Sequence, residues 1–139
     1  GMTDRLVLAG FMPESARWIG HFDLLALSSR SEQAPIAVIE AMAAGLPVVS
    51  PAVGDVAAMV GEANRPFIAV DEPDFRAALA RLADDAALRG AVGAENRRVA
   101  AERFAESGMV AGYQSLYARA LEGYDVFTGR FLGSDPAFD

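Results

Sequence analysis

The stretch from Asp23 to Ser50 reads DLLALSSRSEQAPIAVIEAMAAGLPVVS and carries a strand, a helix and a second strand. Asp23–Ser28 is an apolar run without polar alternation, which is typical of a strand buried on both faces. From Pro35 to Ala44 apolar residues recur at helical spacing, with proline suited to the first turn and Gly45 to the C-terminal cap. Leu46–Ser50 is another buried run. This alternation predicts a parallel sheet.

The same pattern continues on both sides of this stretch. Arg5–Gly10 and Pro66–Val70 predict two further strands, while Pro13–Ile19 and Gly54–Val60 predict short helices. From residue 72 onward, apolar stripes at helical spacing predict a helical C-terminal third.

The predicted fold class is therefore α/β. We expect a Rossmann-like parallel sheet of about four strands with flanking helices and a helical C-terminal third. Residues 1–123 would form this domain, and residues 124–139 would form an irregular C-terminal tail.

Composition excludes several classes of function. The chain has 139 residues, with 12 Lys and Arg against 19 Asp and Glu, so its net charge of −7 argues against nucleic acid as a partner. It has one histidine, His21, and no cysteine, so it lacks a thiolate or histidine-cluster metal site. The longest uncharged run, Ala41–Gly54, contains two prolines and is too short to span a bilayer. Because the start also lacks a signal peptide, we expect a cytoplasmic protein.

Two carboxylates stand out near the expected ligand edge of the sheet. Glu32 lies in the loop after the Asp23–Ser28 strand, where it either caps the following helix or leaves the helix amides to hold an anion. Glu40 lies one turn into the helix among alanines. Its carboxylate is either solvated or a bidentate acceptor for a pair of ribose hydroxyls. Since only one of the two lies in the helix, we expect them to bind different ends of an extended ligand.

A second loop, with Gly54 and Asp55, follows the Leu46–Ser50 strand at the same edge. Gly54 either makes a plain turn or permits close approach of the backbone to a ligand. Beside the first loop, it would form the second wall of one cleft.

Residues 29–49 read SRSEQAPIAVIEAMAAGLPVV. This run resembles the signature of family 4 of the retaining glycosyltransferases, in which two glutamates flank seven residues and Glu-Ala-Met-Ala-x-Gly-x-Pro-Val follows. The similarity covers residues 5–122. It implies the two-Rossmann-domain architecture called GT-B, with a nucleoside diphosphate sugar held mainly by the C-terminal domain. An acceptor saccharide or lipid would bind through the N-terminal domain.

The resemblance also implies roles for individual residues. Glu32 would contact the donor sugar as the catalytic carboxylate, and Glu40 would hold the ribose hydroxyls. The other implied substrate-binding positions are Ser29, Arg30, Ala34, Ile36, Gly54 and Asp55. Sugar transfer would retain the anomeric configuration and would need no metal and no cofactor besides the donor substrate.

The sequence departs from the family pattern in two ways. Ala58 stands where the family often has a glutamate. The N-terminal domain and the first two strands of the C-terminal domain are missing, so we expect a truncated piece without transferase turnover of its own. We also expect it to form a homo-oligomer through its exposed sheet edge or face.

Two other interpretations stay open. In one of them, the chain is a non-catalytic nucleotide-sugar-binding or interaction module encoded as a short stand-alone protein. The reading frame upstream of Met2 would distinguish such a module from a truncated enzyme. In the other, the chain belongs to a sugar-nucleotide epimerase of the same architecture, although the two-glutamate pattern favours the transferases.

Overall fold

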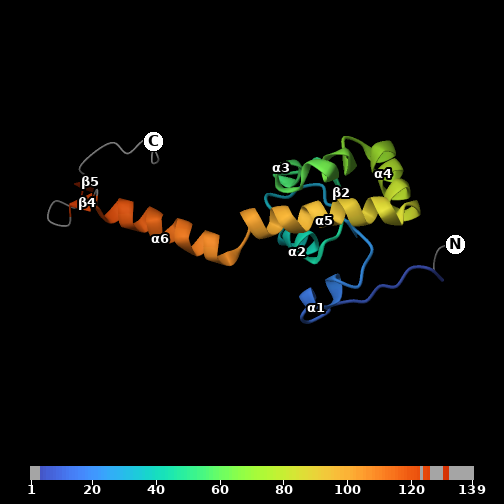
Figure 1. Cartoon of the computed structure of the whole chain (residues 1–139), viewed down its shortest axis with the longest axis horizontal. Helices are drawn as coiled ribbons and strands as arrows, with labels where there is room; N and C mark the ends of the chain where they lie inside the picture. The colour runs from blue at the N-terminus through green and yellow to red at the C-terminus, as the bar shows by residue number, and fades with distance from the viewer. Residues whose placement is uncertain (1–3, 123, 126–129, 132–139) are drawn as a thin grey trace. The chain divides into compact units, whose positions relative to one another are not determined.

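Figure 1 shows the computed structural model of the chain, which describes residues 4–122, 124–125 and 130–131. The chain divides into two compact units, Gly1–Glu102 and Arg103–Asp139. A parallel sheet with its helices forms the first unit, and the second contains a long helix and a short antiparallel strand pair. Within the described ranges, no helix combines the length and the apolar character needed to cross a bilayer.

Three parallel strands form the sheet of the first unit, in the order β1-β2-β3. Their bounds are β1 Leu25–Ala26, β2 Val48–Pro51 and β3 Ile68–Ala69. The register places Leu25 opposite Val48 and Ser50 opposite Ile68. Three of the expected strands are thus confirmed, and the sheet is parallel as predicted. Since the strands share one direction, the loops that leave their carboxyl ends lie along one edge.

The strand expected at Arg5–Gly10 does not form. Leu6, Val7 and Leu8 are 61%, 86% and 87% exposed, and no strand of the described residues pairs with this segment. A strand persists only where a neighbour takes up its backbone N–H and C=O groups. The described sheet therefore has three strands instead of about four. The apolar composition of the segment suggested a strand but carried no information about which neighbour it would have.

Helices connect the strands in the order that the sequence predicts. Up to the boundary between the units they are α1 Ala16–Ile19, α2 Ile36–Ala44, α3 Val56–Met59, the 3-10 helix η1 Glu62–Phe67, α4 Glu72–Asp84 and α5 Ala86–Arg103, whose last residue belongs to the second unit. Only η1 was not expected. Gly45 ends α2 with a φ of 79°, and its N–H donates to the carbonyls of Ala41 and Met42, which confirms the predicted cap. Asp71 caps α4 by accepting from the Asp74 N–H at 2.9 Å.

Both faces of the sheet are buried. Val48 and Val49 are neighbours in β2, so their side chains point to opposite faces, and both are fully buried. Val49 packs in a core cluster with Phe67, Leu82 and Val92, which places α4 and α5 over one face. The other face is covered by α2, which packs against β2 and buries Val38 and Met42 completely. This two-sided burial explains why the strands lack polar alternation.

Two buried asparagines tie α5 to the start of β2. Asn64 accepts from the Val48 N–H and donates to the Val48 carbonyl, both at 2.8 Å. Asn96, on α5, donates to Asn64 Oδ1 at 2.8 Å and to the Leu46 carbonyl at 2.9 Å. Its Oδ1 accepts from the Gly61 N–H at 3.1 Å. This network satisfies polar groups that would otherwise be unpaired in the core.

The second unit contains α6, Glu106–Glu122, followed by β4 Tyr124–Asp125 and β5 Arg130–Phe131, which pair antiparallel. The long helices α4, α5 and α6 confirm the predicted helical C-terminal third. The β4–β5 pair lies in the tail that was expected to be irregular. The rest of that tail, residues 126–129 and 132–139, lies outside the described residues.

Candidate functional site

Two loops leave the carboxyl ends of β1 and β2 and pack on each other. The Asp55 N–H donates to the Gln33 carbonyl at 2.7 Å. Gly54 has a φ of 51°, and a Cβ built on it would lie 2.2 Å from the Gln33 oxygen and 2.5 Å from the Glu32 oxygen. The two loops therefore lie side by side, as the sequence predicts, and join through their backbones. The close approach that Gly54 permits is to the neighbouring loop.

Glu32 lies in the first of these loops and is half-buried. Within the described residues its carboxylate makes no hydrogen bond or ion pair. The next helix, α2, follows Pro35 and has no side-chain cap at its N-terminus. Glu32 therefore does not cap α2, which was one of the two interpretations of this residue. Its carboxylate is available to a ligand beside the positive end of the helix.

Glu40 lies on α2 in a groove of about 420 Å³. Ala43 and Ala44 line the groove on the α2 side, so the small neighbours noted in the sequence do leave space there. The opposite wall comes from α1 and its C-cap residue Gly20, and it includes Arg17 and Ile19. The carboxylate of Glu40 is half-buried and has no partner among the described side chains. It is therefore placed to accept hydrogen bonds from hydroxyl groups of a bound molecule.

Arg97, on α5, also lines the Glu40 groove, and sequence reasoning missed it. Its Nη2 donates to the Ala44 carbonyl at 2.7 Å. α5 comes this close to α2 because Gly93 has no side chain; a Cβ there would lie 1.9 Å from the Gly45 oxygen. Arg97 follows Ala44 by 53 positions, so no local motif could have identified it. Arg17 lines the groove too, and its guanidinium is paired with Glu14 at 3.0 Å, so the groove combines one carboxylate with two guanidiniums.

A second groove, of about 350 Å³, opens at the carboxyl ends of all three strands. It is lined by Ser28 after β1, Pro51 at the end of β2 and Val70 after β3, together with Arg30. Arg30 is exposed and forms no ion pair with any residue that the structure describes. This is the edge at which open parallel sheets bind ligands. Arg30 thus offers a cation there, in a groove that Asp71 and Glu72 also line.

The structure separates the predicted site residues into three places. The residues around the two packed loops and the start of α2 are Ser29, Glu32, Ala34, Ile36, Gly54 and Asp55. Glu40 lies in the groove with Arg97, and Arg30 lies in the groove at the strand ends. Ala34 and Ile36 are both exposed, and Asp55 is the N-cap residue of α3 without a side-chain cap bond. Glu40 therefore lines a groove beside α2, whereas Glu32 lies in the loop before α2 and does not line that groove.

Residues 1–85 match the profile of the family described as Glycosyl transferases group 1. The chain belongs to this family. The resemblance drawn from residues 29–49 is confirmed at this level. In this group 1 glycosyltransferase, the matched residues include both glutamates, the two packed loops, all three parallel strands and α4. No curated protein matches the sequence of this chain.

Proposed function

We propose that this chain binds the nucleoside diphosphate sugar of a family 4 retaining glycosyltransferase with GT-B architecture. The sugar would pass to an acceptor saccharide or lipid. Membership of the group 1 glycosyltransferases supports glycosyl transfer as the reaction. The observation that carries the donor-binding role is the pair of half-buried carboxylates of Glu32 and Glu40, neither of which has a partner among the described residues. An ionised carboxylate without a protein partner keeps its acceptor capacity for the hydroxyl groups of a ligand.

The two carboxylates serve different parts of the donor. Glu40 accepts hydrogen bonds from two ribose hydroxyls in its groove, where Ala43 and Ala44 leave room for the ring. Glu32 contacts the sugar from the loop before α2. Their separation by one helical turn and a loop suits a ligand that is extended along the start of α2.

The leaving diphosphate binds at the start of α2. Ala34 and Ile36 are exposed residues there, and no side-chain cap takes up the first amides of the helix. A helix N-terminus carries about half a positive elementary charge and stabilises bound anions. Arg30 adds an unpaired cation at the neighbouring strand ends. Catalysis then rests on positioning of the donor and on stabilisation of the charge that develops on the diphosphate, with no metal required.

Calorimetric titration of the chain with UDP, GDP and ADP tests the proposal. We expect one of these nucleotides to bind. Glu40→Gln should then weaken binding by about 1–3 kcal/mol, because charge-assisted hydrogen bonds to the ribose are lost. Glu102→Gln is the matched control, since Glu102 is exposed on α5 and makes only a surface ion pair with Arg98.

Two results would contradict the proposal at different points. If none of the three nucleotides binds, the donor-binding role is wrong. If a nucleotide binds with the same affinity to wild type and to Glu40→Gln, Glu40 is not part of the site.

A further inference from the structure

The guanidinium of Arg97 is held in a fixed place in the Glu40 groove. Its Nη2 donates to the Ala44 carbonyl at 2.7 Å. A Cβ on Gly45 would lie 2.9 Å from Nη2 and 3.1 Å from Cζ, so the guanidinium packs directly against the glycine that ends α2. Arg97 makes no other hydrogen bond and no ion pair with the residues that the structure describes. Its remaining N–H groups can therefore donate to a bound molecule.

The walls of the groove beside Arg97 are partly apolar. Ala43 lines it on the α2 side and Ile19 on the α1 side. Arg17 also lines it, but its guanidinium is paired with Glu14 at 3.0 Å. The groove volume of about 420 Å³ is within the range of small-molecule sites, about 300–1,000 Å³. Because arginine only donates hydrogen bonds, a group that binds beside Arg97 must supply acceptors.

The position of Arg97 along α2 indicates which part of the donor it meets. In the proposed function the diphosphate lies at the start of α2, which is Ile36, and Glu40 binds the ribose one helical turn later. Ala44, beside Arg97, lies one further turn along, or about 6 Å. In a nucleotide the diphosphate is attached to C5′ and the base to C1′, so the two leave the ribose in different directions. The base therefore extends from Glu40 toward Arg97.

We propose that Arg97 recognises the base of the donor and selects one with a carbonyl group, uracil or guanine, over adenine. This inference rests on the proposed function. Uracil presents O4 as an acceptor and guanine presents O6 and N7, whereas adenine has an amino group in place of that carbonyl. The N–H groups of Arg97 would face this amino group without a partner. A site that donates to a carbonyl rejects a ligand without one, because its donors lose water and gain no acceptor.

The bond from Arg97 to Ala44 also gives this side chain a structural role. A cation that bonds a carbonyl in the last turn of a helix stabilises that helix. Loss of this role alone would change the affinity for every nucleotide by the same factor. Loss of base recognition would instead change the affinity only for bases with a carbonyl. The ratio of affinities for different bases therefore separates the two roles.

Calorimetric titration of wild type and Arg97→Met with UDP, GDP and ADP tests the proposal. We expect wild type to bind UDP or GDP at least about tenfold more tightly than ADP, equivalent to about 1.4 kcal/mol. Arg97→Met should reduce this preference to about twofold or less and leave the affinity for ADP within about twofold of wild type, because only the bonds to the carbonyl are lost. Arg97→Lys keeps a cation but lacks the planar fork of donors, so its preference should lie between the two.

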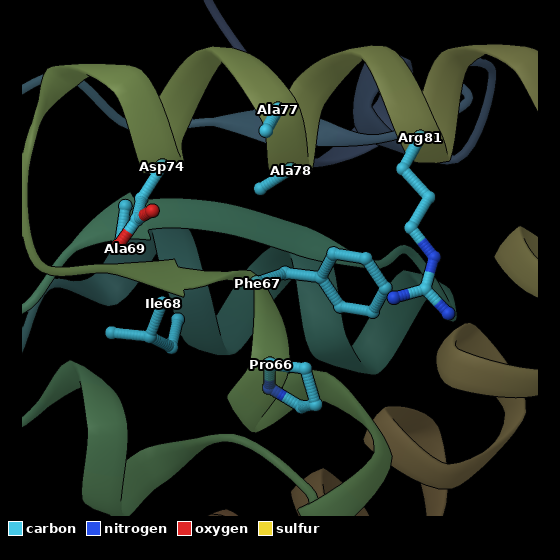
Figure 2. Close-up of a pocket in the computed structure, with 8 residues that line it drawn as sticks. All are labelled: Pro66, Phe67, Ile68, Ala69, Asp74, Ala77, Ala78 and Arg81. Carbon is cyan, nitrogen blue, oxygen red and sulfur yellow. The ribbon is translucent and has the colours of Figure 1, made fainter.

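Two other arginines are controls for the loss of one positive charge. Arg98 neighbours Arg97 on α5, but it is paired with Glu102 at 2.7 Å and does not line the Glu40 groove. Arg81 lies in a separate groove between β3 and α4, where its guanidinium is 5.4 Å from the centroid of the Phe67 ring (Figure 2). Arg98→Met and Arg81→Met should leave both the affinities and the base preference unchanged.

The outcomes separate this inference from the proposed function. If no nucleotide binds to wild type, both are wrong. If nucleotides bind but wild type prefers ADP, or if Arg97→Met weakens all three equally or none of them, the role of Arg97 is wrong and the donor-binding role stands. A base preference that either control variant also abolishes would overturn the inference in the same way. Circular dichroism of each variant reports whether it is folded.

Discussion

At the residue scale, Asn64 and Asn96 show how much of the fold depends on single polar side chains. Asn96 lies on α5 and bonds to three separate segments, through the Leu46 carbonyl, the Gly61 N–H and Asn64 Oδ1. Both asparagines are fully buried. A buried hydrogen bond adds modest stability when made, but a buried group left unpaired costs its full desolvation free energy. These side chains therefore hold the start of β2 in place.

Asn96→Ala should lower the free energy of unfolding by about 2–4 kcal/mol. The change leaves the Leu46 carbonyl and the Gly61 N–H without their partner, and each unpaired group costs about 1–3 kcal/mol. Urea denaturation measures the loss. Gln33→Ala is the control, because the Gln33 side chain is exposed and should change stability little. A loss no larger for Asn96→Ala than for Gln33→Ala would show that the buried network contributes nothing.

At the element scale, α5 lies against the end of α2 through a glycine. A Cβ on Gly93 would lie 1.9 Å from the Gly45 carbonyl oxygen, a distance no real structure tolerates. The contact also lets Arg97 reach the Ala44 carbonyl and the Glu40 groove. Gly90, one turn earlier on the same helix, has nothing within 4 Å of its Cβ position. Of these two glycines, only Gly93 is required by a close contact.

Gly93→Ala and Gly90→Ala should change stability in opposite directions. Gly93→Ala overpacks the contact with α2 and should cost about 1–3 kcal/mol. Gly90→Ala meets no atom and restricts the unfolded chain, so it should add about 0.5–1 kcal/mol. Chemical denaturation of the two variants in parallel gives both values. Equal effects would mean that the close approach of α5 to α2 is not as described.

At the scale of the whole molecule, burial in the first unit is confined to part of the chain. Among the described residues, those that are buried run from Pro35 to Ala100. Residues 4–11 contribute none, although they include Leu6, Val7, Leu8 and Phe11, the last of which is 93% exposed. Exposed side chains add little to the free energy of folding because the hydrophobic effect scales with the apolar area removed from water.

Deletion of residues 1–10 should therefore change the free energy of unfolding by less than about 0.5 kcal/mol. In contrast, Leu82→Ala should cost about 2–5 kcal/mol, since Leu82 is fully buried in the cluster between the sheet and α4. Thermal unfolding of both variants measures the difference. A deletion as costly as Leu82→Ala would show that the N-terminal segment packs into the core after all.

Much of the architecture could be predicted from local sequence. Pro35 and Gly45 delimit α2 because one restricts φ before a helix and the other adopts the left-handed conformation after it. The unbroken apolar runs at Asp23–Ser28 and Leu46–Ser50 predicted strands covered on both faces, and β1 and β2 lie within or across those runs. Residues 29–49 likewise predicted membership of the group 1 glycosyltransferases, which the family match confirms. Whether Glu32 and Glu40 bind a donor stays a prediction.

By itself, then, the sequence determined the order of the elements, the parallel sense of the sheet and the positions of the two glutamates along the chain. These follow from side-chain periodicity and from the backbone limits of proline and glycine, which act over a few residues. The tertiary structure alone decided that Arg5–Gly10 finds no strand partner, that Arg97 joins the Glu40 groove and that Gly54 serves the contact between two loops. Each of these depends on which distant segment of the chain lies beside the residue, and local sequence patterns do not specify such neighbours.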